Sequence, residues 1–149
     1  MSTNSVTLHR VLKAAPEKVY RAFTEAHAMA AWLPPYGFLC VVHNLEAKPG
    51  GRYRMSFINF STGNETSFGG EFLEIRPNEF LKYTDQFEDQ NLPGQIITSV
   101  WLAKVSAGTE LRVTQEGIPD VIPPDMCYLG WQDSLDKLKK LVEPDIPDN

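Results

Sequence analysis

Turn signals at short intervals between residues 36 and 118 constrain this chain more than any other feature. Each signal contains the Pro, Gly, Asn or Ser residues that tight turns favour, as at residues 48–51, where Pro49 precedes two glycines. The runs between the turns are rich in β-branched and aromatic residues, and consecutive strands joined by short turns pair with their neighbours. We therefore predict an antiparallel meander of six strands, within residues 38–47, 52–60, 66–75, 80–88, 95–105 and 110–118.

Helical patterns flank this meander on both sides. Residues 6–14 resemble another strand, and after them Pro16 suits the start of a helix, with Val19 and Phe23 at helical spacing. A second short helix is predicted over residues 26–32, before two prolines end it. The last element is predicted as an amphipathic helix over residues 126–142, about 25 Å long.

The apolar positions of this last helix form one stripe, which consists of Cys127, Trp131, Ser134, Leu135, Leu138 and Val142. Pro124 and Asp125 suit its first turn, whereas Leu129 falls on the polar side. A helix of this kind is suited to cover the apolar face of a curved sheet. In the strands, Tyr53, Met55 and Phe57 share one face. The run 95–105 fits two assignments of its inner face: Ile96, Val100 and Leu102, or Ile97, Trp101 and Val105.

Length and charge limit the class of protein. The 149 residues are expected to form a single domain, with an ordered core over about 5–143 and a tail over 144–149. A net charge of −5 disfavours nucleic-acid partners, and no apolar run approaches the roughly 20 residues of a membrane span. The N-terminus has no apolar signal-peptide core, so we expect a cytoplasmic protein. In that compartment Cys40 and Cys127 do not indicate a disulfide framework.

Signature residues occur in a fixed order from about Leu8 to Val142. They are Arg10, Ala15-Pro16, Val19, Trp32-Leu33-Pro34-Pro35, Gly37-Phe38, Pro49-Gly50-Gly51-Arg52-Tyr53, Gly70, Glu74-Ile75, Pro77, Gly108-Thr109, Gly130-Trp131, Leu135 and Leu138. In this order they resemble the activator of heat-shock protein 90 ATPase homologue-like family of the SRPBCC or START-like superfamily. The resemblance implies an α+β helix-grip fold, in which a curved antiparallel sheet of about seven strands, two short helices and one long C-terminal helix enclose a hydrophobic cavity.

The same resemblance places a ligand site under the upper half of the last helix. There Gly130 would leave space and Trp131 would line or cap the cavity. The candidate ligand-binding residues are Trp32, Phe38, Tyr53, Phe57, Tyr83, Tyr128 and Trp131. Packing in an ordinary core is the alternative role for each of these aromatic residues. The segment WLPPYGF is either a mobile gate beside this site or a plain helix terminator.

The sequence contains none of the common catalytic motifs, so we predict no catalytic residue and favour a protein that is not an enzyme. The three histidines, His9, His27 and His43, have no metal-ligand spacing, and no metal or cofactor is expected. Cys127 is expected to be a buried, inert thiol. Of the polar strand residues, one or two are expected to point into the cavity as anchors or bases; the candidates are Glu71, Glu74, Asp85, Gln115 and Glu116.

Three functions remain open at this point. The leading hypothesis is a binding protein for a small hydrophobic or amphipathic molecule. The second is a stress-related interaction module with a well-packed interior, whose partner is a chaperone or another protein. The third is a cyclase- or hydrolase-type enzyme on an aromatic or polyketide-like substrate, with Asp85, His43 or Tyr83 as acid or base.

Two features bear on the partners. In the family that this sequence resembles, the proteins that activate the heat-shock protein 90 chaperone carry a separate N-terminal domain. The present sequence begins a few residues before its first predicted strand, so we expect that domain to be absent. A Trp101 on the outer face of the sheet would favour a homodimer.

Overall fold

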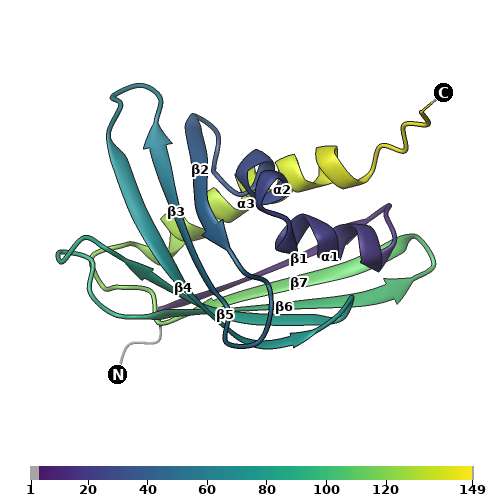
Figure 1. Cartoon of the computed structure of the whole chain (residues 1–149), viewed down its shortest axis with the longest axis horizontal. Coiled ribbons are helices and arrows are strands. Elements are labelled where there is room, and N and C mark those ends of the chain that lie inside the picture. The colour runs from purple at the N-terminus through teal and green to yellow at the C-terminus, as the bar shows by residue number, and fades with distance from the viewer. Residues whose placement is uncertain (1–3, 149) are drawn as a thin grey trace.

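A computed structural model describes residues 4–148, and it contains seven strands and three helices in these residues (Figure 1). The elements follow one another as β1 (Ser5–Leu12), α1 (Pro16–Thr24), α2 (Ala26–Trp32), β2 (Phe38–Leu45), β3 (Arg52–Asn59), β4 (Glu65–Arg76), β5 (Phe80–Phe87), β6 (Ile96–Val105), β7 (Gly108–Glu116) and α3 (Pro124–Val142). The first three residues of the predicted domain, and Asn149 of the predicted tail, lie outside the described residues. Residues 144–148 have no regular secondary structure and are exposed.

All seven strands belong to one antiparallel sheet with the order β1-β7-β6-β5-β4-β3-β2. Strands β2 to β7 form the predicted meander, and β1 pairs with β7, so that β1 and β2 become the two edges. The sheet curls, α3 lies across its concave face, and α1 and α2 lie on the same side as α3 (Figure 1). This arrangement confirms the predicted helix-grip fold.

Alternation along the strands determines which side chains reach the concave face. On β3, Tyr53 and Met55 are buried, whereas Arg52 and Arg54, which alternate with them, are exposed. The structure also decides the question left open for β6. Ile96, Val100 and Leu102 are buried, while Trp101 is 40% exposed and packs on Phe80 on the outer face, with ring centroids 5.4 Å apart.

Helix α3 begins at Pro124, two residues before the predicted start, and ends at the predicted Val142. Its first turn contains Asp125 and its last turn contains two lysines, charges that complement the partial charges of the helix ends. The predicted stripe is buried from Trp131 to Val142, while Cys127 is half-buried and the misfit Leu129 is exposed. The C-terminal half of the helix therefore packs into the core, and its N-terminal half is free to border a cavity.

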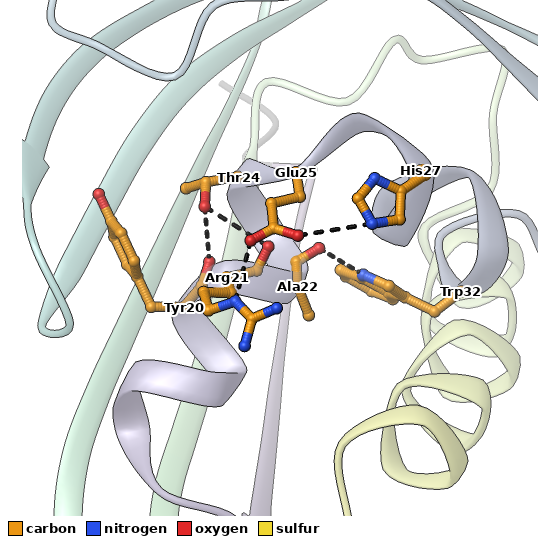
Figure 2. Close-up of polar contacts among 7 residues, drawn as sticks. All are labelled: Tyr20, Arg21, Ala22, Thr24, Glu25, His27 and Trp32. Carbon is orange, nitrogen blue, oxygen red and sulfur yellow. Dashed lines mark hydrogen bonds and ion pairs between the residues drawn. The ribbon is translucent and has the colours of Figure 1, made fainter. Parts of the chain in front are cut away.

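The corner between α1 and α2 is held by polar contacts around Glu25 and Trp32, shown in Figure 2, and by an aromatic contact to Trp32. The indole Nε1–H of Trp32 donates a 2.8 Å hydrogen bond to the carbonyl oxygen of Ala22, and the ring of Phe23 meets the indole edge to face at 4.7 Å. On the solvent side, Arg21 and His27 both lie within ion-pair distance of Glu25. Trp32 is fully buried and joins the two short helices.

Candidate ligand cavity and its polar end

A cavity of about 410 Å³ lies between the concave face of the sheet and the N-terminal half of α3. Its wall is mostly apolar. Seven aromatic side chains contribute to it: Phe38, Tyr53, Phe57, Phe68, Tyr83, Phe87 and Trp131. They come from the four strands β2 to β5 and from α3, so the curl of the sheet is what brings them together.

Five of the seven aromatic residues proposed from the sequence line this cavity: Phe38, Tyr53, Phe57, Tyr83 and Trp131. The rings of Phe38 and Phe57 lie 6.3 Å apart on the neighbouring strands β2 and β3. Tyr53 and Tyr83 are perpendicular at 5.8 Å, although they lie on strands β3 and β5, which are separated by β4.

The other two proposed residues, Trp32 and Tyr128, are not part of the wall. Trp32 is held by the Ala22 carbonyl, and its ring lies behind Trp131, with 6.5 Å between the centroids. Tyr128 is 38% exposed on α3, whereas its neighbours on the helix, Cys127 and Gly130, border the cavity. Trp32 can therefore support the wall through Trp131, but neither residue contacts the space itself.

One carboxylate and its hydrogen-bond partners form a polar end within this apolar wall. The Tyr53 hydroxyl donates to Oδ1 of Asp85 and also lies 2.7 Å from the carbonyl oxygen of Thr84. The Thr98 hydroxyl donates a 2.8 Å hydrogen bond to Oδ2 of Asp85. Gln115 in turn approaches the Thr98 hydroxyl at 3.4 Å. Tyr53, Asp85 and Gln115 line the cavity, and the fully buried Thr98 bonds to the last two of them. We call these four side chains the polar end of the cavity.

Burial changes the acid–base properties of this polar end. It raises the pKa of Asp85 from 3.8 to about 6, and the hydrogen bonds from Tyr53 and Thr98 oppose that rise because they favour the charged form. The pKa values of Tyr53 and Tyr83 lie well above 10, mainly because of burial and then because of the Asp85 charge. At neutral pH both phenols are therefore neutral hydrogen-bond donors beside an ionised carboxylate.

The polar strand residues separate as the sequence predicted, with one or two of them turned inward. Asp85 and Gln115 line the cavity, whereas Glu71, Glu74 and Glu116 do not. Of the proposed acids and bases, Tyr83 and Asp85 are in the wall. His43 is not in the wall. Its ring bonds at 2.8 Å to Ser56, which follows the inward-facing Met55 on β3 and therefore points to the opposite face of the sheet. The cavity thus contains the ionisable group that the enzyme hypothesis requires.

Several wall residues were missed by sequence reasoning, above all Phe68 and Phe87. These two residues are direct partners in the β4–β5 register, with ring centroids 6.1 Å apart. Phe87 could have been predicted, because side chains alternate along a strand and Tyr83, Asp85 and Phe87 therefore share one face of β5. For Phe68 the signal was weaker, because the glycines after it carry no side chain and a bulge between Phe72 and Glu74 breaks the alternation of β4.

Helix α3 is fastened to the segment that follows α2. The Ser134 hydroxyl donates a 2.6 Å hydrogen bond to the carbonyl oxygen of Leu33, and the Lys137 ammonium group donates a 2.8 Å bond to that of Pro34. Leu33 and Pro35 both border the cavity. Of the two roles predicted for this segment, these bonds favour the terminator that packs on its neighbours over the mobile gate.

The thiols and the remaining charged groups point to no second centre in residues 4–148. Burial raises the pKa of Cys127 and brings that of Cys40 to about 11, which leaves both thiols protonated at neutral pH. No cluster of three or more His, Cys, Asp or Glu side chains forms a metal site in this part of the chain. The described helices are all too short or too polar to span a bilayer.

Comparison with protein-family profiles identifies one family. The profile of the family described as "Activator of Hsp90 ATPase homolog 1-like protein" matches residues 13–143. A crystal structure of a Chromobacterium violaceum protein is 54% identical, with a TM-score of 0.94, and the match covers 95% of this chain and 99% of that one. No curated protein matched the sequence.

Two more distant structures show the same fold. A Rhodobacter sphaeroides protein is 19% identical with a TM-score of 0.82, and the match covers 92% of this chain and 90% of that one. An AHSA1-like protein from Aeromonas hydrophila, solved by solution NMR, is also 19% identical, with a TM-score of 0.76 and coverage of 93% and 92%. Because the family profile spans most of the residues and the fold agrees, this chain belongs to the Activator of Hsp90 ATPase homolog 1-like family.

Proposed function

We propose that this protein binds a small hydrophobic or amphipathic molecule in the cavity beneath α3. The observation that carries the proposal is the cavity itself, with a volume of about 410 Å³ and a wall dominated by aromatic and aliphatic side chains. Sites for small molecules are typically concave, roughly 300–1,000 Å³ in volume, and mostly apolar with a few polar groups that orient the ligand. The polar end around Asp85 supplies such groups.

The cavity also bears on the alternatives. An interaction module for a chaperone or another protein would be expected to have a closed, well-packed interior, and a space of about 410 Å³ argues against it. An enzyme on an aromatic or polyketide-like substrate remains the second candidate, because Asp85 provides an acid or base within the cavity. We further propose a cytoplasmic location, and the exposed Trp101 is the feature that would support a homodimer.

Native mass spectrometry of freshly purified protein, followed by denaturing extraction, tests this function directly. We expect an excess mass of a few hundred daltons, roughly that of the drug-sized molecules that such cavities accept. The extracted molecule would then identify the chemistry. A clean mass of the chain alone, together with no thermal shift across a panel of lipids and aromatic compounds, would contradict the proposal and favour the interaction module.

Two tryptophans of this chain provide a matched pair for locating the site. Trp131 lines the cavity and is 8% exposed, whereas Trp101 lies on the outer face of the sheet. We expect Trp131→Ala to weaken binding of the extracted molecule by at least about tenfold, and Trp101→Ala to leave it within about twofold. Thermal melts of both variants establish that each one is folded, and equal effects on binding would place the site elsewhere.

A further inference from the structure

The cavity wall combines many aromatic rings with a single acidic group. Among the residues of the described chain that line it, Asp85 is the only acid, and none is Lys, Arg or His. Seven of the lining side chains are aromatic. The faces of such rings carry negative electrostatic potential, and they attract cations within about 6 Å. The ring faces and the carboxylate of Asp85 therefore both favour a positively charged ligand.

Asp85 retains capacity to accept further hydrogen bonds. An ionised carboxylate has two oxygens with about four lone-pair positions. The described side chains fill two of them, with Tyr53 on Oδ1 and Thr98 on Oδ2. Asp85 is only partly buried by the protein because it faces the cavity, so that an occupant can reach the positions that remain.

Asp85 also has no cationic partner among the described residues, where every ion pair involves other acids. A carboxylate removed from water without a counter-charge is destabilised, and a cation brought to it by a ligand would relieve that cost. A ligand carboxylate at the same place would instead face a like charge, which costs free energy. We therefore expect the wall to disfavour anionic amphiphiles such as fatty acids.

We infer that the cavity takes an amphipathic organic cation, with an apolar body against the aromatic rings and a protonated amine paired with Asp85. This inference rests on the proposed binding function and adds the class of ligand. Gln115 and the Tyr53 hydroxyl line the same end of the cavity and supply neutral polar groups beside the amine.

Asp85 is the group that gives this binding its pH dependence. The titratable groups that face it are Tyr53 from β3 and Tyr83 from β5, and both remain neutral well above pH 7. Strands β6 and β7 present the uncharged Thr98 and Gln115, and across the cavity α3 presents the Cys127 thiol, which burial keeps protonated. The pKa of Asp85 is about 6, so acidification from pH 7.5 to 5 neutralises the carboxylate. An alkylamine stays protonated over that range, as the lysine amine does with its ordinary pKa of about 10.4.

Three probes with the same apolar body test the inference by isothermal titration calorimetry: 1-naphthylmethylamine, 1-naphthylmethanol and 1-naphthoate. At pH 7.5 we expect the amine to bind at least about tenfold more tightly than the alcohol, and naphthoate to bind most weakly. At pH 5 the advantage of the amine over the alcohol should fall by about tenfold, since most of Asp85 is then protonated.

The variant Asp85→Asn keeps the size of the side chain and removes its charge. We expect it to lose the amine advantage at both pH values, to bind the alcohol within about twofold of the parent, and to bind naphthoate more tightly. Glu71→Gln, which removes an acid outside the cavity, is the matched control and should behave as the parent does. If Asp85→Asn does not fold, the probe series at two pH values on the unmodified protein decides the question alone.

The outcomes separate this inference from the function on which it rests. Equal affinities for the three probes, or naphthoate as the tightest, would overturn the cationic ligand and leave a cavity that binds apolar molecules. An amine advantage that persists at pH 5 would overturn the role of Asp85. No binding of any probe, together with a clean native mass, would overturn both the inference and the proposed function.

Discussion

The hydroxyl of Tyr53 on β3 donates a hydrogen bond to the carboxylate of Asp85 on β5, across the strand that separates them. This bond and the one from Thr98 hold the only acid of the cavity wall among the described residues in a fixed orientation. Burial raises the pKa of Asp85, and the bond from Tyr53 opposes that rise because it favours the charged carboxylate, so the contribution of this bond can be measured.

Removing the Tyr53 hydroxyl should make Asp85 a weaker acid. In Tyr53→Phe the carboxylate loses a donor that stabilises its charged form, while its burial stays the same, so its pKa should rise above the parent value of about 6. Carbon-13 NMR titration of the Asp85 carboxyl group measures the shift. An unchanged or lower pKa would show that the bond contributes little to the charge at this site.

The charge of Asp85 should make the free energy of unfolding depend on pH. Its folded pKa of about 6 exceeds the unfolded value of 3.8, so the contribution is fully present below the unfolded pKa and is lost as pH rises through the folded one. From pH 4 to pH 8 the parent should lose about 2 kcal/mol of stability relative to Asp85→Asn. Urea unfolding of both proteins at each pH measures this, and comparing them cancels the titration of other groups. A difference independent of pH would contradict the raised pKa.

The link between α3 and the end of α2 should contribute measurably to stability. Ser134→Ala removes the donor to the Leu33 carbonyl oxygen inside the protein, where an unsatisfied acceptor costs about 1–3 kcal/mol. Asp136→Ala, on the exposed side of the same helix, is the control and should change the free energy of unfolding by less than about 0.5 kcal/mol. Both variants replace a polar residue by Ala, so both gain a similar amount of helix propensity. If urea unfolding gave the two variants the same stability, the bond to Leu33 would contribute nothing.

Much of this architecture could be predicted from local patterns. Turn residues and alternation set each strand within about two residues of its place, because each turn is encoded locally. The inner face of β6 could not be predicted in this way, because both alternating sets of its side chains contain large apolar residues. In the structure Trp101 lies on the outer face, where it packs against Phe80, its partner in the register.

The polar end of the cavity was harder to foresee for a related reason. Asp85 was one of five candidate strand residues, but its bond to Tyr53 depends on how strongly the sheet curls across β4. Register between neighbouring strands does not specify that curl. Tyr128 was difficult to place for a similar reason: it is exposed, whereas Cys127, the residue before it on α3, lines the cavity.

Gly130 provides a way to fill the cavity from the helix. A Cβ atom built there meets only the side chain of Pro35, at 3.7 Å, which is ordinary van der Waals contact. Gly130→Ala should therefore gain helix propensity and raise the free energy of unfolding by up to about 1 kcal/mol. Gly130→Leu should gain a similar amount from propensity, while its longer side chain enters the space that a ligand would occupy. We expect the leucine variant to bind 1-naphthylmethanol at least about tenfold more weakly than the alanine variant, as measured by calorimetry. The alcohol is the appropriate probe because its binding does not depend on the charge of Asp85. If both variants were folded and bound the alcohol equally well, the ligand would have to lie away from α3, and the cavity beneath this helix would not be the binding site.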